Sequence, residues 1–227
     1  MRKLLIAVVI LVVLFIAIDR IGVAVAENQI SNRLATTYGL SEKPGVSITG
    51  FPFLTQVVAG DYQQINVTAN QIQANGTTLH DLNVRLTGVH ASIGQLFGSG
   101  SSMVTADQAA GSALVGFATV DQRLPQGVRI TSNGRNLVVS GKVSYNGFQV
   151  PVSGTVSLGV SGSGITVTPE NVTIAGGLTL PASYFSRLHY VVPLSNLPLH
   201  LHLTSVHVTP DGLRISAAAR NVQFARA

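Results

Sequence analysis

An apolar segment near the N-terminus constrains this chain more than any other feature of its sequence. Arg2 and Lys3 precede it, and residues 4–18 then follow without a polar side chain. A basic start followed by such a run is typical of an export signal. The run is short for a membrane span, which needs about 20 residues. The sequence therefore predicts an exported protein of the periplasm or cell envelope.

The fate of this segment stays open between two alternatives. Ala24-Val25-Ala26 supplies the small-residue pattern of a cleavage site before Glu27, in which case residues 1–26 are a signal peptide that is removed. In the other alternative the helix continues through Asp19-Arg20, and residues 4–26 anchor the chain to the cytoplasmic membrane.

Composition limits the function classes that remain. Only 10% of the 227 residues are charged, against about 25% in an average domain, which leaves few carboxylates for acid–base catalysis. The net charge is +5, yet the basic residues are scattered singly, whereas nucleic-acid binding needs a basic patch. We therefore expect no nucleic acid partner, and a mild positive charge that suits an anionic membrane surface. Cysteine is absent, which excludes disulfides and a lipid-modified N-terminal cysteine.

The rest of the chain reads as one helix followed by strands. Ile30, Leu34 and Tyr38 recur at a spacing of four, which predicts one face of an amphipathic helix that starts near Glu27. Gly39 is suited to end this helix. Further along, β-branched residues, Gly and Asn dominate. The predicted strands cover residues 57–74, 79–89, 104–115, 128–132, 137–145, 150–160, 165–174, 197–209 and 213–224.

Turns and glycines complete the predicted fold. Type I′ hairpin turns are expected at Asn133-Gly134, Asn146-Gly147 and Asp211-Gly212. Two short helices are expected at residues 117–124 and 181–188, the second opening with a proline. Several strands are long and rich in glycine, as in a strongly curved antiparallel sheet. We therefore predict an α+β, mostly β fold, with a single β-rich domain over residues 27–227.

No motif of a known enzyme class occurs in the sequence. His200-x-His202 places two imidazoles on one face of a strand, but no carboxylate lies nearby in sequence to complete a metal site. Asp61, Asp81 and Asp107 stand in different strands, and nothing in the sequence links them for hydrolysis. We therefore predict no catalytic residues, no metal, no cofactor and no enzymatic activity.

The block Gly50-Phe51-Pro52-Phe53-Leu54-Thr55-Gln56 gathers two aromatic rings and a leucine around a proline. It suits either a hydrophobic plug that caps the core or the apolar wall of a binding cavity. A second apolar cluster surrounds Tyr184-Phe185. It also includes Leu188, Tyr190, Val191 and Val192.

The block carries a specific resemblance, to which other segments contribute. These are Asp19-Arg20, Ala26-Glu27-Asn28 with Ile30, Val58-Ala59-Gly60-Asp61-Tyr62, Leu197-Pro198-Leu199, Val206, Val208, and Asp211-Gly212-Leu213-Arg214-Ile215-Ser216-Ala217. Together with the block they resemble the LmeA-like family of bacterial phospholipid-binding cell-envelope proteins, over essentially all of the chain after the apolar segment.

The resemblance implies a long curved antiparallel sheet wrapped around an N-terminal helix, as in tubular lipid-binding (TULIP-like) proteins. It implies non-enzymatic binding, and transfer, of phospholipids such as phosphatidylinositol. It also implies support of mannosylated envelope lipid biosynthesis, with an envelope mannosyltransferase as partner. The alternative is a structural or scaffolding partner of an envelope enzyme, without a ligand cavity.

Two sets of residues are candidates for lipid contact. The expected apolar lining consists of Phe51, Pro52, Phe53, Leu54, Val57, Phe117, Tyr184, Phe185, Leu188 and Val192. An acyl chain recovers about 0.8 kcal/mol for each CH2 that such a lining removes from water. Arginine is the preferred partner of phosphate. The head-group candidates are Arg85, Arg123 and Arg187.

Overall fold

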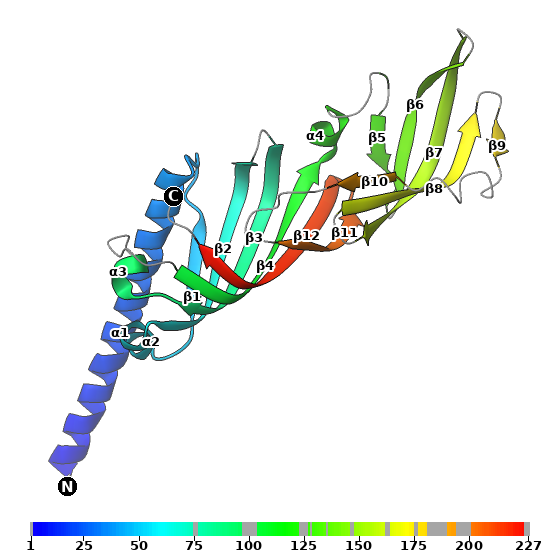
Figure 1. The fold of residues 1–227 in the computed structure, drawn as a ribbon. Coiled ribbons are helices and arrows are strands. Elements are labelled where there is room, and N and C mark those ends of the chain that lie inside the picture. Colours follow the sequence, from blue (N-terminus) through cyan, green and yellow to red (C-terminus); the bar gives the residue numbers. More distant parts are fainter. Residues whose placement is uncertain are drawn as a thin grey trace. The chain divides into compact units, whose positions relative to one another are not determined.

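The computed structural model consists of a long N-terminal helix and two open β-sheets (Figure 1). It describes residues 2–74, 77–96, 104–122, 127, 129–134, 136–145, 148–161, 164–174, 177–180, 190–193 and 201–224. The chain divides into two compact units. Unit 1 comprises Met1–Asn70, Asn83–Ala110 and Ala219–Ala227, and unit 2 comprises Gln71–Leu82 and Gly111–Ala218.

Helix α1 (Arg2–Thr37) joins the apolar segment and the predicted amphipathic helix into one element of 36 residues. It ends as predicted, because Gly39 takes a left-handed conformation with φ 59° and the Leu40 N–H donates to the Ala35 carbonyl at 2.9 Å. Tyr38 lies beyond the last helical residue and is 68% exposed. The expectation that Tyr38 shares the buried face was therefore wrong, because the chain leaves the helix before it.

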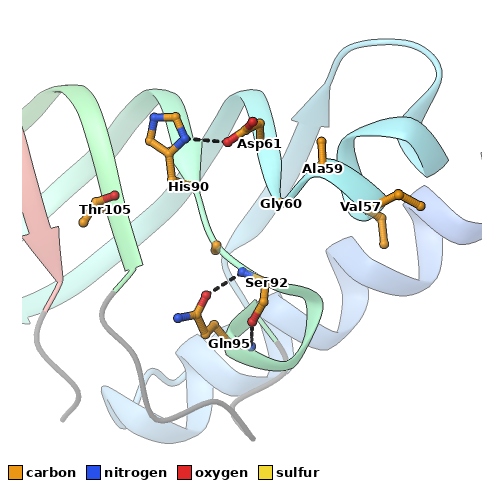
Figure 2. Close-up of a pocket in the computed structure, with 10 residues that line it drawn as sticks. Val57, Ala59, Gly60, Asp61, His90, Ser92, Gln95 and Thr105 are labelled. Carbon is orange, nitrogen blue, oxygen red and sulfur yellow. Dashed lines mark hydrogen bonds and ion pairs between the residues drawn. The ribbon is translucent and has the colours of Figure 1, made fainter.

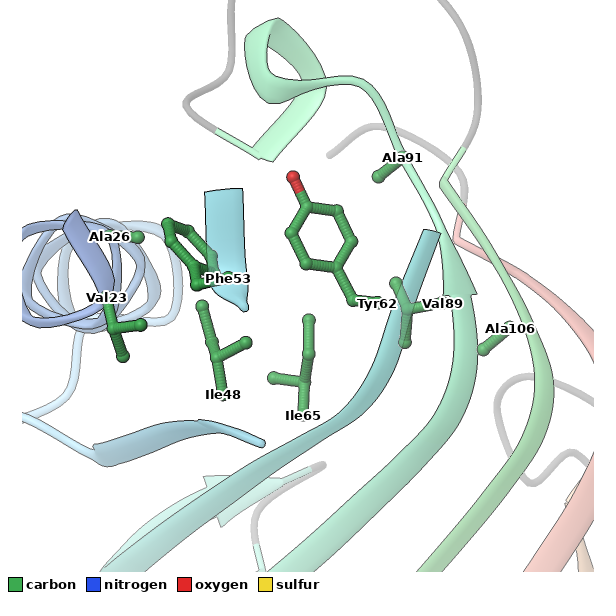
Figure 3. Packing of buried hydrophobic residues seen from close by; sticks show 9 residues of the cluster. All are labelled: Val23, Ala26, Ile48, Phe53, Tyr62, Ile65, Val89, Ala91 and Ala106. Atoms are coloured by element: carbon green, nitrogen blue, oxygen red, sulfur yellow. The ribbon is translucent and has the colours of Figure 1, made fainter. Parts of the chain in front are cut away.

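The core of unit 1 forms where α1 packs on the sheet (Figure 3). Val23 and Ala26 of α1 face Ile48 of β1 (Gly45–Thr49), with Phe53 between the helix and the strands. The core also contains Tyr62, Ile65, Val89, Ala91 and Ala106. Two hydrogen bonds tie α1 to the chain around β1. The Ser31 hydroxyl donates to the Pro44 carbonyl at 2.6 Å, and the Ile48 N–H donates to the Glu27 carboxylate at 2.8 Å.

The first sheet has the strand order β1-β2-β3-β4-β12-β11. Its strands are β2 (Asp61–Ala74), β3 (Thr77–His90), β4 (Val104–Gly116), β11 (His202–Val208) and β12 (Gly212–Phe224). β1 pairs antiparallel with β2, and β11 pairs antiparallel with β12. Two short helices, α2 (Phe53–Ala59) and α3 (Ile93–Leu96), flank the start of β2 and the end of β3.

The second sheet belongs to unit 2 and has the order β10-β8-β7-β6-β5, with β9 also paired to β8. Its strands are β5 (Arg129–Ser132), β6 (Leu137–Tyr145), β7 (Phe148–Ser161), β8 (Gly164–Ile174), β9 (Leu178–Leu180) and β10 (Tyr190–Pro193). All the pairings in this sheet are antiparallel. Helix α4 (Phe117–Asp121) precedes β5, and the Asp121 carboxylate accepts the Ile130 N–H at 2.9 Å.

The predicted fold class is confirmed, since the described chain is mostly antiparallel β with an N-terminal helix. Two predicted strands extend too far. In the one predicted over 197–209, residues 201 and 209 lie outside β11, and residues 197–200 lie outside the described part. Residues 57–59 belong to helix α2 and not to the strand that follows, because Gly60 ends this helix in a left-handed conformation (φ 73°) before β2 begins. The predicted helix over 117–124 is present as α4, although residues 123 and 124 lie outside the described part. The helix predicted over 181–188 lies outside it entirely.

The three predicted hairpin turns differ in how they compare with the structure. β6 and β7 pair as far as Tyr145 and Phe148, which fits a two-residue turn at 146–147, but those two residues lie outside the described part. Ser132 pairs with Leu137, so the loop after β5 has four residues and not two. The type I′ turn at Asp211-Gly212 was wrong, because neither residue has a positive φ. Glycine suits position 212 for a different reason, which is lack of space. An added Cβ would lie 2.2 Å from the Val115 carbonyl oxygen.

Candidate functional site

Unit 1 contains an open pocket of about 590 Å³ where α2, the start of β2 and the end of β3 meet (Figure 2). This volume falls within the range of about 300–1,000 Å³ that small-molecule sites occupy. The lining combines aliphatic and polar side chains. It consists of Val57, Val58, Ala59, Gly60, Asp61, His90, Ala91, Ser92, Gln95 and Thr105.

Helix α2 supplies the apolar wall of the pocket, and α1 fixes its position. The residue before α2, Pro52, provides no side-chain cap. The buried Asp19 carboxylate of α1 instead accepts the Leu54 N–H at 2.9 Å, and thereby satisfies one of the free N–H groups of the first turn. At the other end Val57 packs against the core, whereas Val58 is 89% exposed.

The polar side of the pocket is organised by His90 at the end of β3. Its Nδ1 lies 2.6 Å from Asp61 Oδ1, and its Nε2 lies 3.3 Å from Asp107 Oδ1. The hydrogen bonds to these two carboxylates raise the pKa of His90 above its ordinary value of 6.5. With each ring nitrogen close to a carboxylate, the imidazole bridges the three strands β2, β3 and β4.

Gly88 makes this bridge possible. It has φ 60°, and an added Cβ would lie 2.2 Å from Asp107 Oδ2. The missing side chain therefore leaves room for Asp107 to lie across β3 and reach His90. Only glycine adopts this backbone conformation without strain and also provides that space.

The turn into α3 borders the pocket on a further side, through Ser92 and Gln95. Ser92 and Gln95 form a reciprocal capping box, in which the Gln95 side chain accepts the Ser92 N–H and the Ser92 hydroxyl accepts the Gln95 N–H at 3.3 Å (Figure 2). The Ala91 N–H donates to the Gly60 carbonyl at 2.8 Å. The end of β3 is thereby held against the end of α2.

Two polar atoms remain without a hydrogen bond inside the core of unit 1. The Tyr62 hydroxyl and the Gln56 Nε2 are buried, and no described group bonds to them. Burial raises the pKa of Tyr62. The Tyr62 ring lies 6.2 Å from the Phe53 ring. In the same amide group of Gln56, the oxygen Oε1 does have a partner, since it accepts the Gln63 N–H at 2.9 Å.

The residues of the apolar block lie in different surroundings. Phe53 is only 3% exposed and belongs to the core, whereas Phe51 is 57% exposed, with the Arg20 guanidinium 5.3 Å above its ring. Pro52 and Leu54 are half-buried. Of the predicted lining residues, Val57 lines the pocket.

The remaining candidates lie elsewhere in the chain. Phe117 packs against the core of unit 2. Arg85 is exposed on β3 and is not part of the pocket lining. Val192 belongs to β10, but its side chain is not described. Tyr184, Phe185, Leu188, Arg123 and Arg187 lie outside the described residues.

Sequence reasoning missed the polar side of the pocket. Asp61 and Asp107 were considered only as carboxylates with nothing to link them, and His90 provides the link. That link depends on strand register, which the sequence pattern did not give. The Ser92-x-x-Gln95 spacing is a capping-box signature and could have predicted α3.

Comparison with known proteins identifies one family. A sequence model described as LmeA-like phospholipid-binding matches residues 17–218 of the 227. The match covers α1 from the end of its apolar segment, the pocket, and all of unit 2. No curated protein matches the chain significantly, and neither does any solved structure.

Proposed function

Because the chain belongs to the LmeA-like phospholipid-binding family, we propose that it binds a phospholipid in the open pocket of unit 1 and catalyses no reaction. The observation that carries this proposal is the composition of the pocket. Val57, Val58 and Ala59 form an apolar wall on one side, and Asp61 and His90 form a polar rim on the other. A phospholipid has the same two kinds of surface in one molecule.

The polar rim favours a head group that is rich in hydroxyls, such as that of phosphatidylinositol. Asp61 in the rim is a hydrogen-bond acceptor that hydroxyl groups satisfy, while its carboxylate, together with that of Asp107 on the same imidazole, would repel a bare phosphate. The bridging imidazole of His90 offsets part of their charge when it is protonated. Arg85 in unit 1, and Arg123 and Arg187 in unit 2, remain proposed partners of a lipid phosphate in their own units.

We place the protein in the cell envelope, with α1 retained as its membrane anchor. Asp19, Val23 and Ala26 are buried in unit 1, and cleavage before Glu27 would remove all three from the core. Retention keeps the pocket next to a supply of lipid. Transfer of phospholipid towards mannosylated envelope lipid synthesis, with a mannosyltransferase as partner, is the process that we propose it serves.

The wider apolar set belongs to the same proposal. Phe51, Pro52 and Leu54 flank the start of α2 and would guide an acyl chain towards Val57. Separately, Phe117, Tyr184, Phe185, Leu188 and Val192 are our proposed lipid-contacting residues of unit 2. Each acyl CH2 that is covered contributes about 0.8 kcal/mol, so an apolar path supplies affinity without specific polar contacts.

A direct test is lipid extraction from the purified full-length protein, followed by mass spectrometry. We expect a phospholipid in the extract, and binding of a fluorescent phosphatidylinositol by the delipidated protein. Thr105→Phe places a ring in the pocket from β4 and should weaken this binding about tenfold or more, a loss of about 1.4 kcal/mol per factor of ten. Gln108→Phe, at an exposed position on the same strand, is the matched control.

Two outcomes would contradict the proposal in different ways. An extract without phospholipid, together with no binding of the fluorescent lipid, would favour a scaffolding role for the protein. Equal binding by Thr105→Phe and Gln108→Phe would leave phospholipid binding in place but remove it from this pocket.

A further inference from the structure

The apolar surface of α1 continues past the charged pair that ends the apolar segment in sequence. Asp19 is fully buried, with its carboxylate bonded to the Leu54 N–H at 2.9 Å and to the Arg20 guanidinium at 2.7 Å. Of the pair, only Arg20 reaches the surface. Beyond it, Ile21 and Val25 are 64% and 58% exposed, so the helix presents apolar side chains to its surroundings for about one more turn.

Helix α2 widens this apolar surface at the same level of α1. It packs directly on the α1 backbone, since a Cβ added at Gly22 would lie 3.5 Å from the Phe53 ring. Two side chains at its ends point away from the core. Phe51, just before the helix, is 57% exposed, and Val58, in its last turn, is 89% exposed. The Arg20 guanidinium stacks over Phe51 at 5.3 Å, a pairing of a cation with an aromatic ring that suits a membrane–water interface.

The length of the helix indicates what covers this surface. Residues 4–18 span about 22 Å at 1.5 Å per residue, which is shorter than the hydrocarbon core of about 30 Å. Residues 4–25 span about 33 Å and match it. By its length and composition, α1 is long and apolar enough to cross a membrane. A bilayer of ordinary thickness around residues 4–25 therefore has its domain-side surface beside Ile21, Val25 and the start of α2.

We propose that Ile21, Val25, Phe51 and Val58 form a membrane foot, by which unit 1 rests in the interfacial layer of the phospholipid bilayer that α1 spans. This inference rests on the proposed function in so far as α1 is retained as an anchor. Val58 belongs both to the foot and to the pocket lining. Helix α2 has seven residues and is about 10 Å long, so the pocket opens close to the bilayer surface and a lipid enters it without crossing bulk water.

The depth of single tryptophans tests this arrangement, since the chain has no tryptophan of its own. The reporters are Phe51→Trp and Val58→Trp in the full-length protein, reconstituted into phosphatidylcholine–phosphatidylglycerol vesicles. Leu11→Trp, at a position 67% exposed within the apolar segment, reports on insertion of the helix. Tyr38→Trp, at the far end of α1 and 68% exposed, is the matched control for a position in water. Quenching is measured with lipids brominated at different depths and with aqueous iodide.

We expect Phe51→Trp and Val58→Trp to be quenched by lipids brominated near the head group, and iodide to quench them several-fold less than Tyr38→Trp. Leu11→Trp should respond to deeply brominated lipids. If Leu11→Trp is deep while Phe51→Trp and Val58→Trp behave like Tyr38→Trp, the anchor stands and the foot is wrong. If Leu11→Trp is also accessible to iodide, both are wrong. Phospholipid extraction from the purified Leu11→Trp and Tyr38→Trp proteins before reconstitution tests binding separately, since neither position lines the pocket. Failure of the foot is therefore not mistaken for failure of the pocket.

Discussion

The two units bury their apolar side chains in different ways. Among the described residues of unit 1, one cluster collects side chains from α1, α2 and four strands, and its central members are almost inaccessible: Ala26 and Tyr62 are each 1% exposed. In unit 2 the described residues form two smaller clusters. One contains Ile130, Leu137, Val156 and Leu213, and the other contains Ile165, Leu203 and Val206. Most of these residues keep 7–8% exposure.

The difference teaches what α1 contributes to the fold of unit 1. A helix laid on a sheet covers the apolar face of the strands, and α1 does this with Val23 and Ala26 while Glu27 and Ser31 bond to the chain around β1. In unit 2 the described apolar positions around the clusters, such as Leu158 and Val167, are only half-buried. Such a surface has more to gain from contact with an acyl chain than a closed core has.

The largest expected effect follows from removing a ring from the core of unit 1. Phe53→Ala should lower the free energy of unfolding by about 3–5 kcal/mol, because it leaves a cavity between α1 and the sheet. Ile130→Ala in unit 2 should cost about 2–3 kcal/mol, since its site is smaller and closer to solvent. Urea denaturation, with hydrogen exchange resolved by segment, measures both losses. Equal losses at the two sites would mean that the two cores are packed alike.

A smaller effect within unit 2 tests a close approach of two strands. Gly212→Ala would bring a Cβ to 2.2 Å from the Val115 carbonyl oxygen, so β12 or β4 must shift. We expect a loss of about 1–3 kcal/mol. The control is Gly159→Ala on β7, where an added Cβ meets nothing within 4 Å and a reduced entropy of the unfolded chain predicts no loss, or a gain of up to about 1 kcal/mol. A destabilised Gly159→Ala with an unchanged Gly212→Ala would reverse this account of unit 2.

Local patterns in the sequence predicted most of the strands and the end of α1, because alternation, chain reversal and a helix-stopping glycine are local properties. Gly39 and the residues of β6 illustrate this, since the structure places both as predicted. The pocket could not be predicted in the same way. Helix α2 depends on Asp19, 35 residues away in sequence, and the link from Asp61 through His90 to Asp107 depends on three strands in register. Apolar composition marked the block around Phe53, but composition alone does not tell a core ring from an exposed one such as Phe51.

The smallest expected effect is the pH dependence that His90 gives to unit 1. The bonds to Asp61 and Asp107 raise the pKa of His90, so the folded chain holds the proton more tightly than the unfolded chain does. The stabilisation is therefore complete below the unfolded pKa of about 6.5 and is lost as pH rises through the higher folded pKa. The imidazole is half-exposed, so the effect is small and is screened by salt.

Between pH 6 and pH 9 the melting temperature of the wild type should fall further than that of His90→Gln. His207→Gln, at an exposed histidine of β11, is the control and should follow the wild type. Gly88→Ala displaces Asp107 from His90 and should reduce the pH dependence part of the way. A wild type and a His90→Gln variant with parallel profiles would show that the bridge does not hold a proton at neutral pH. Asp61 and Asp107 would then keep their full negative charge beside the pocket.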